Sequence, residues 1–191
     1  IILSCLFSGC NHKPIENKSL HATIFRYNES KGITSLDPAY ARTQTNIWPV
    51  SQIFNGLVQL DDSLHVRPAI ARDWKISDDG KEYTFFLRTD VRFHDSPYFT
   101  SNEDQIVNAA DFKFSFERIL DPEIASPGGW IFDYVRKEDG FHVVNDSTFR
   151  ISLKRSFPPF LSVLAMPYCS VVPKAVVENE ELNFSYNPVG T

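Results

Sequence analysis

The chain has 191 residues, a length that fits one medium-sized domain or slightly more. Its hydrophobic residues (42%) and charged residues (23%) give an ordinary globular composition, which excludes a disordered chain. The net charge of −5, with no clustered run of Lys and Arg, excludes the basic face that nucleic-acid binding requires. We therefore expect an ordered protein with no nucleic-acid partner.

The first ten residues are typical of the end of an export signal. An apolar run, Ile1 to Phe7, precedes the small residues Ser8 and Gly9, then Cys10 and polar sequence. An apolar stretch closed by small residues predicts a secretory signal, and this one is too short to span a bilayer, which takes about 20 apolar residues. A short buried strand is the alternative, but polar sequence follows at once.

The cysteine after the small pair resembles the bacterial lipobox, in which that cysteine is acylated and becomes the mature N-terminus. The resemblance implies that Cys10 is lipidated, with residues 1–9 as a signal remnant and 10–20 as the lipidated N-terminus and tether. Cys5 would leave with the signal, so Cys169 would be the one cysteine of the mature chain and no disulfide framework is expected. The apolar neighbours of Cys169 predict a small core residue.

The next segments predict a strand, a turn and a helix. Residues 21–27 alternate apolar and polar side chains, as a strand does. The sequence 36–38 predicts a turn, because proline keeps the preceding residue out of the helical region. Apolar residues at helical spacing predict a helix over 45–57, with Pro49 in its first turn, where a missing N–H costs little.

The middle of the chain predicts a hairpin and a second helix. Segments 74–77 and 83–88 flank an Asp-Gly turn at Gly80, a strong hairpin signal. Asn108 and Asp111 have the spacing of a capping box that starts a helix, and Asp121-Pro122 ends it. The apolar stripe of this helix is expected to consist of Phe112, Phe116, Ile119 and Leu120.

The remaining elements are a strand over 149–153 and short helices over 160–166 and 174–181. Short strands mixed with helices indicate an α/β to α+β fold, and the meander-like middle argues against a doubly wound parallel sheet.

No enzyme constellation is visible in the sequence. The five histidines are scattered, with no HExxH pair, and no nucleophile elbow, phosphate-binding loop or dinucleotide fingerprint occurs. The acidic pairs Asp61-Asp62 and Asp78-Asp79 are best interpreted as turns, and His94-Asp95 as a solvated turn rather than an acid–base pair. We expect a protein that is not an enzyme, with no catalytic residue, no metal site and no cofactor.

A series of segments in one order resembles the extracytoplasmic solute-binding proteins of family 5, which serve peptide, dipeptide, nickel and related ABC importers. Any one segment is a weak signal, but seven in register are highly specific. They are SLDPA (35–39), IFNGLVQLD (53–61), RPAIARDWKISDDGKEYTFFLRTDVRFHD (67–95), NAADFKFSFERILDP (108–122), FPPFLSVLAMP (157–167), VVPKAVVE (171–178) and NPVGT (187–191).

The resemblance implies a type II periplasmic binding protein-like fold, in which two lobes close over the solute. Residues 21–56 and 173–191 would form part of lobe one, and residues 57–172 the extra subdomain of the family. The second lobe is expected to follow Thr191 and is absent from this sequence.

The resemblance also implies two ligand-facing loops. The first follows the SLDP turn and consists of Ala41, Arg42, Thr43 and Gln44. Arg42 would suit a ligand carboxylate, and a solvated surface arginine is the alternative. The second loop is expected to contribute Gly128 and Trp130. Peptide binders can place an aromatic residue where this sequence has Gly128, so the pocket wall there is expected to be wider or differently shaped, with Trp130 as a replacement.

The expected function is therefore the solute-binding component of an ABC importer, which captures oligopeptides or dipeptides outside the cytoplasmic membrane and delivers them to a permease. We expect a monomer, periplasmic or at the cell surface, with a lipid anchor at Cys10. One alternative keeps the fold and changes the ligand to a nickel chelate, an oligosaccharide, haem or a signalling peptide. The other is a surface lipoprotein hydrolase, which would need a nucleophile–base pair or metal cluster that this sequence lacks.

Overall fold

The computed structural model describes residues 26–179 and 181–191. The expected signal remnant, Cys10, the tether and residues 21–25 of the predicted first strand lie outside the described residues, and Arg26 and Tyr27 belong to no strand or helix.

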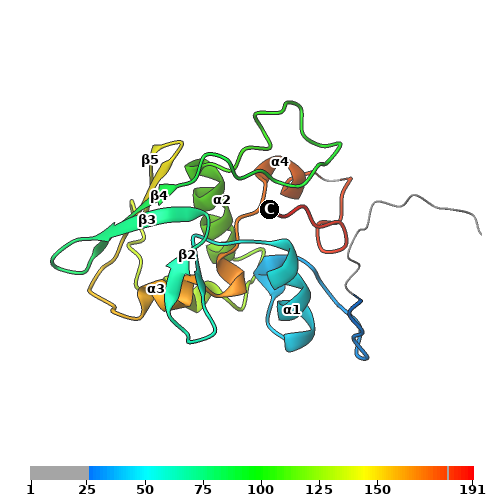
Figure 1. The fold of residues 1–191 in the computed structure, drawn as a ribbon, viewed down its shortest axis with the longest axis horizontal. Helices are drawn as coiled ribbons and strands as arrows, with labels where there is room; N and C mark the ends of the chain where they lie inside the picture. The colour runs from blue at the N-terminus through cyan, green and yellow to red at the C-terminus, as the bar shows by residue number, and fades with distance from the viewer. Residues whose placement is uncertain (1–25, 180) are drawn as a thin grey trace, which may run out of the picture.

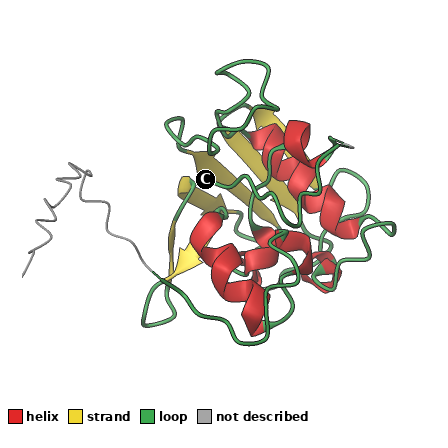
Figure 2. Ribbon diagram, turned by 90° about the vertical axis from the view of Figure 1, so that its right-hand side faces the viewer, coloured by secondary structure: helices red, strands yellow, loops and turns green. Residues whose placement is uncertain are grey.

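A four-stranded antiparallel sheet forms the centre of the fold, with strand order β3-β4-β6-β5. Its strands are β3 (Ala71–Ile76), β4 (Glu82–Leu87), β5 (Phe141–Asn145) and β6 (Thr148–Ser152). A separate two-stranded ribbon pairs β1 (Val58–Leu60) with β2 (Val66–Pro68). The sheet lies on the left in Figure 1 and behind the helices in Figure 2.

The predicted hairpin is confirmed as β3 and β4. Gly80 turns the chain with a positive φ of 67°, a conformation that glycine adopts without steric cost. In β4, Tyr83, Phe85 and Leu87 are buried and alternate with half-buried residues, which is the period-two pattern of a strand with one core face. The predicted strand at 149–153 is also confirmed, as β6.

Strands β1, β2 and β5 were not predicted from the sequence pattern. The first two have three residues each, too few for a periodic pattern. In β5 the adjacent Val143 and Val144 interrupt the alternation, and the register shifts between Val143 and Asn145.

The predicted second helix is α2 (Ala109–Leu120), and both halves of its capping box are present. The Asn108 side chain accepts hydrogen bonds from the helix amides, and the Asp111 carboxylate accepts one from the Asn108 backbone at 2.9 Å. Phe112, Phe116 and Ile119 are buried as expected, but Leu120 is 46% exposed, so its place in the apolar stripe was wrong. The last residue of the helix lies beyond the edge of the packed face.

Helix α2 packs on the sheet through a cluster of phenylalanine rings. Phe116 lies 4.9 to 5.8 Å, centroid to centroid, from three rings of neighbouring elements. These rings are Phe132, Phe141 and Phe149. Aromatic rings bury large apolar areas, so this cluster forms the core between helix and sheet.

The predicted first helix is α1 (Gln44–Ile53). Two 3₁₀ turns are also present: η1 (Pro38–Tyr40) precedes α1, and η2 (Gly129–Phe132) comes later in the chain. Pro49 is the sixth residue of α1, not in its first turn, so that prediction was wrong. The helix stops at Ile53 because Phe54 is extended and the chain there turns toward a bridge between Gly56 and Ser170.

The last elements are α3 (Phe160–Leu164), η3 (Pro167–Cys169) and α4 (Lys174–Val177), the last shorter than the predicted 174–181. Cys169 is completely buried, which confirms it as a small core residue. Helices α1 and α4 lie on the far side of α2 from the sheet (Figure 1). The mixture of helices and antiparallel sheet agrees with the α+β prediction.

Among the described residues no helix has the length and apolar character needed to span a membrane.

Candidate functional site

The loop of residues 41–44 follows η1 directly, and Asp37 caps the start of η1. The Asp37 side chain accepts a hydrogen bond from the Ala39 amide at 2.9 Å, and proline occupies the first position of the turn. The Arg42 amide then bonds the Tyr40 carbonyl at 2.7 Å. Thr43 is extended and starts α1. The direction of the loop is therefore set by a capped turn before it and a helix after it.

The four residues of this loop face different surroundings. Ala41 is completely buried in the core, so its side chain packs rather than faces solvent. Arg42, Thr43 and Gln44 are exposed. The Thr43 hydroxyl lies 2.7 Å from that of Thr45 and does not cap α1. A positive side chain and an uncapped helix N-terminus both favour a negatively charged group here.

The second loop, residues 125–130, is shaped by local hydrogen bonds. Ala125 has a positive φ of 49°, and the Ser126 hydroxyl accepts a hydrogen bond from the Gly128 amide at 3.1 Å. The following turn, η2, is anchored by buried Ile131 and Phe132. Trp130 is 50% exposed on this anchored turn, which leaves much of a large ring available for contacts.

The fold brings the two loops together. The Ser126 hydroxyl donates a hydrogen bond of 2.6 Å to the Ala39 carbonyl, across 87 positions in the sequence. Two segments that sequence analysis placed in one site on the strength of a resemblance are therefore neighbours in space.

Tyr168, which was not predicted as a site residue, belongs to η3, which packs against η1, and its ring lies against the second loop. Gly128 is buried against its ring: a Cβ on Gly128 would be 2.6 Å from the ring's Cγ. Burial raises the pKa of Tyr168, and the positive charge of Arg42 lowers it in part. The space beside Gly128, expected to be a wider pocket wall, is filled by this tyrosine.

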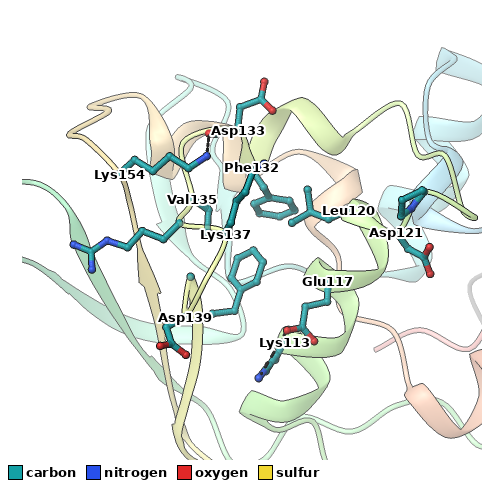
Figure 3. Close-up of a pocket in the computed structure, with 14 residues that line it drawn as sticks. Lys113, Glu117, Leu120, Asp121, Phe132, Asp133, Val135, Lys137, Asp139 and Lys154 are labelled. Carbon is teal, nitrogen blue, oxygen red and sulfur yellow. Dashed lines mark hydrogen bonds and ion pairs between the residues drawn. The ribbon is translucent and has the colours of Figure 1, made fainter.

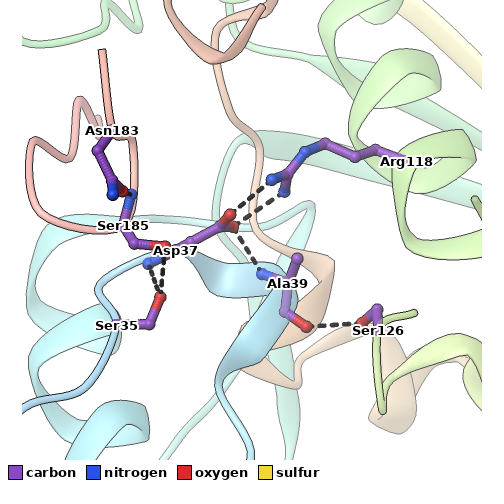
Figure 4. Close-up of polar contacts among 7 residues, drawn as sticks. All are labelled: Ser35, Asp37, Ala39, Arg118, Ser126, Asn183 and Ser185. Carbon is purple, nitrogen blue, oxygen red and sulfur yellow. Dashed lines mark hydrogen bonds and ion pairs between the residues drawn. The ribbon is translucent and has the colours of Figure 1, made fainter. Parts of the chain in front are cut away.

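An ion pair behind the first loop was also missed. Arg118 of α2 donates to both carboxylate oxygens of Asp37, at 2.9 and 2.5 Å (Figure 4). The two side chains are only 11% and 3% exposed. The sequence does carry a signal for it: Asp111, Ser115 and Arg118 form a polar line at helical spacing beside the apolar stripe.

Other surfaces of the described residues are also hollowed, at α2 and at α1 among other places. A space of about 620 Å³ lies between α2 and residues 132–141, with Phe132 and Phe141 among its walls and charged residues of both signs around it (Figure 3). An apolar hollow of about 340 Å³ lies on α1 beside Trp48 and Tyr27. None of the six predicted ligand residues lines either one.

The described residues contain no group of three or more His, Cys, Asp or Glu side chains placed to hold a metal ion. His94 and Asp95, considered above as a possible acid–base pair, are exposed and lie in an irregular segment just before the turn at 97–98. The His94 amide donates a hydrogen bond to the Gly190 carbonyl, and the Asp95 carboxylate accepts one from the Gln105 side chain at 3.4 Å.

Comparison with known proteins gives a consistent match. Residues 65–191 match the family model described as "Bacterial extracellular solute-binding proteins, family 5 Middle". Heme-binding protein A of Haemophilus influenzae is 36% identical over 166 residues, covering 82% of this chain and 30% of that protein. Di/tripeptide-binding protein 2 of Pseudomonas aeruginosa is 34% identical over 172 residues, covering 81% and 32%. The chain thus spans about a third of the length of these relatives.

A solved structure matches over a similar range. The ABC transporter-associated periplasmic binding protein DppA from Helicobacter pylori, in complex with the peptide STSA, superposes with a TM-score of 0.71 at 30% identity, over 83% of this chain and 33% of that one. The antiparallel sheet and its covering helix therefore belong to a known architecture, the type II periplasmic binding protein fold.

Proposed function

The chain belongs to family 5 of the bacterial extracellular solute-binding proteins, and we propose that its protein captures peptides outside the cytoplasmic membrane for an ABC importer. The observation that carries the proposal is the family match over residues 65–191, in a fold that joins two loops, each with exposed polar or aromatic side chains. Members of this family bind solutes, so the role is capture rather than catalysis. Relatives named for di- and tripeptides and a structural neighbour holding a peptide support this ligand class.

We propose that the ligand lies against the 41–44 and 125–130 loops. Arg42 would pair with a carboxylate of the peptide, since its guanidinium is exposed beside the uncapped N-terminus of α1. Thr43 and Gln44 would offer hydrogen bonds, and Trp130 an apolar surface. Ala41 and Gly128 are buried, so their part would be to bring the backbone close to the ligand.

The proposed mechanism is closure of two lobes over the solute. Contacts from both lobes stabilise the closed state, and the closed form docks on the permease. The segments proposed for lobe one, 21–56 and 173–191, are supported by backbone bonds from Leu36 to Ser185 and from Thr191 to Ile53. The proposed extra subdomain, 57–172, holds the whole four-stranded sheet.

We further propose that the mature protein is a monomer outside the cytoplasmic membrane, anchored by a lipid on Cys10. Support for the location comes from a structural neighbour described as periplasmic, and support for the anchor from the residues before Cys10. Metabolic labelling with an alkyne fatty acid tests the anchor: the wild type should be labelled and the C10S variant should not. Labelling of both variants alike would refute it.

Native mass spectrometry of the full-length protein tests the ligand class. Peptides should dissociate from the purified protein as a series of masses from about two to five residues. A single non-peptide mass in their place would contradict the proposal.

The role of Arg42 has a separate test. The R42Q variant should bind trialanine about tenfold or more weakly, since a hydrogen bond to a charged group contributes about 1.5–3 kcal/mol. Trialanine amide, which lacks the carboxylate, should bind wild type and R42Q alike. The control R72Q changes another exposed arginine, on β3, and should leave both affinities unchanged.

Haem is the second candidate ligand, because a relative at 36% identity is named a heme-binding protein. Addition of haemin to the full-length protein would then give a saturable shift of the Soret band. A titration without such a shift would remove this candidate.

A further inference from the structure

We propose that Arg118 is a positioning residue for ligand binding: through Asp37 it fixes the 41–44 loop relative to the 125–130 loop. This inference rests on the proposed function. It assigns a binding role to a residue of α2 that itself belongs to neither loop.

The geometry of the pair restricts orientation as well as distance. Two parallel hydrogen bonds from one guanidinium to one carboxylate hold both groups in a common plane. The same Asp37 carboxylate accepts the Ala39 amide and so starts η1, the turn that leads directly into Ala41 and Arg42. A rotation of the Asp37 carboxylate would therefore change the orientation of η1, from which the 41–44 loop continues.

The second loop is attached to the same turn. The Ser126 hydroxyl bonds the Ala39 carbonyl and also accepts the Gly128 amide, so one serine connects η1 to the residues before Trp130. Only a short segment separates Arg118 from the 125–130 loop. Arg118 lies near the end of α2, Asp121 caps the helix, and the loop follows. Arg118 thus lies close in sequence to the 125–130 loop and is hydrogen-bonded to Asp37, which caps the turn before the 41–44 loop.

The opposite side of Asp37 is held as well. Its amide bonds the Ser35 hydroxyl at 3.1 Å, which bonds the Ser185 hydroxyl at 3.0 Å (Figure 4). The backbone of Asp37 is therefore held by Ser35, and its carboxylate is held by Arg118. Removal of Arg118 alone would leave a buried carboxylate without its cation, which is strongly destabilising. A fair test must remove both charges together.

The test uses the full-length protein and the double variant D37N/R118Q, which keeps an amide oxygen for the Ala39 amide and leaves no lone buried charge. R118K keeps the positive charge and loses the planar fork. K113Q, on the exposed side of α2, where Lys113 pairs with Glu117 at 3.7 Å, is the matched control. Each protein is labelled with 5-fluorotryptophan, and the Trp130 resonance is assigned with W130F.

Without ligand, the Trp130 resonance should shift or split in D37N/R118Q and, less so, in R118K, and stay unchanged in K113Q. Amide exchange of residues 38–47 should speed up, while β4 and β6 keep their protection, a confined effect that a purely stabilising pair would not produce. Unchanged resonance and exchange in the double variant would overturn the proposal, whether or not a ligand is known.

With trialanine, D37N/R118Q should bind about tenfold or more weakly, as when the binding-competent loop arrangement falls to about a tenth of the population. R118K should recover part of that loss. Equal affinity of wild type and double variant would refute the role of Arg118. Absence of binding by the wild type would count against peptide capture instead, and the measurements without ligand would still decide the role of Arg118.

Discussion

The backbone of Gly128 lies against the ring of Tyr168, so closely that a Cβ on Gly128 would be 2.6 Å from the ring's Cγ and 2.7 Å from its Cδ1. A glycine that seemed to leave a space open at the ligand loops is in fact the partner of a buried tyrosine. The two residues occupy a volume that has room for only one side chain.

The first prediction concerns that shared volume. G128A should destabilise the protein by about 1–3 kcal/mol, because the ring of Tyr168 must move from a packed position. The Y168A exchange opens the space, so the double variant G128A/Y168A should be more stable than the sum of the single changes predicts. Urea unfolding of the four proteins measures this coupling.

G129A is the matched control, since a Cβ there would be an ordinary 3.6 Å from the Ile119 carbonyl. It should change stability by less than about 1 kcal/mol. Simple additivity of G128A and Y168A would contradict this explanation, because the cost of G128A would then not depend on the ring of Tyr168.

The second prediction concerns Gly190, which passes over the end of α1. A Cβ on Gly190 would overlap the carbonyl oxygen of Ile53, and the next residue bonds the same carbonyl through its amide at 3.1 Å. G190A should therefore cost about 3 kcal/mol or more and detach Thr191 from Asn55.

G32A separates crowding from backbone strain, because Gly32 has a positive φ of 74° and no atom within 4 Å of a built Cβ. Only the conformational cost applies there, about 1–2 kcal/mol. Thermal unfolding compares the two variants, and a G190A midpoint equal to that of G32A would contradict the crowding argument.

The third prediction concerns pH and the capping box of α2. Burial raises the pKa of Asp111 from 3.8 to about 6, against the smaller opposite effect of the hydrogen bond from Asn108. An acid with a higher pKa in the folded state binds more protons when folded, so stability falls as pH rises through about 4 to 6. D111N should remove up to about 3 kcal/mol of that fall.

The measurement is the free energy of unfolding of both proteins between pH 4 and pH 8. The advantage of D111N over wild type should grow from pH 4 to about pH 6 and then level off. E117Q, an exposed change on the same helix, should follow the wild-type profile. Parallel profiles for D111N and wild type would show that Asp111 carries no such penalty.

The fourth prediction concerns Cys169. The thiol is completely buried and burial raises its pKa far above the ordinary value, so the reactive thiolate is suppressed. In a protein with Cys5 and Cys10 changed to serine, Cys169 should react with a disulfide reagent only after unfolding. A cysteine introduced at exposed Thr43 should react at once, and fast labelling of Cys169 in the native protein would show that this part of the core opens.

Local patterns in the sequence determined the hairpin at Gly80, the capping box of α2 and the burial of Phe112, Phe116 and Cys169. Each depends on residues within one turn or one strand, where spacing alone sets which side chains share a face. The order of the segments also identified the family, and the resemblance implied the two loops that we propose to face the ligand. The three-residue strands β1 and β2 were not predicted because they are too short to show a period, and β5 was not predicted because the adjacent Val143 and Val144 interrupt its alternation.

Only the tertiary structure shows which distant residues hold those two loops in place. The Asp37–Arg118 pair, the Ser126–Ala39 bond and the Gly128–Tyr168 contact join residues 81, 87 and 40 positions apart, and no local pattern specifies which distant partner a polar or aromatic side chain meets. The residues Asp111, Ser115 and Arg118 give α2 a second, polar face, which was not predicted from the sequence. The distant partners of Arg118 and Ser115 are Asp37 and Val172. Packing sets these partners, because a charge or a hydroxyl group that is removed from water needs a hydrogen bond within the protein.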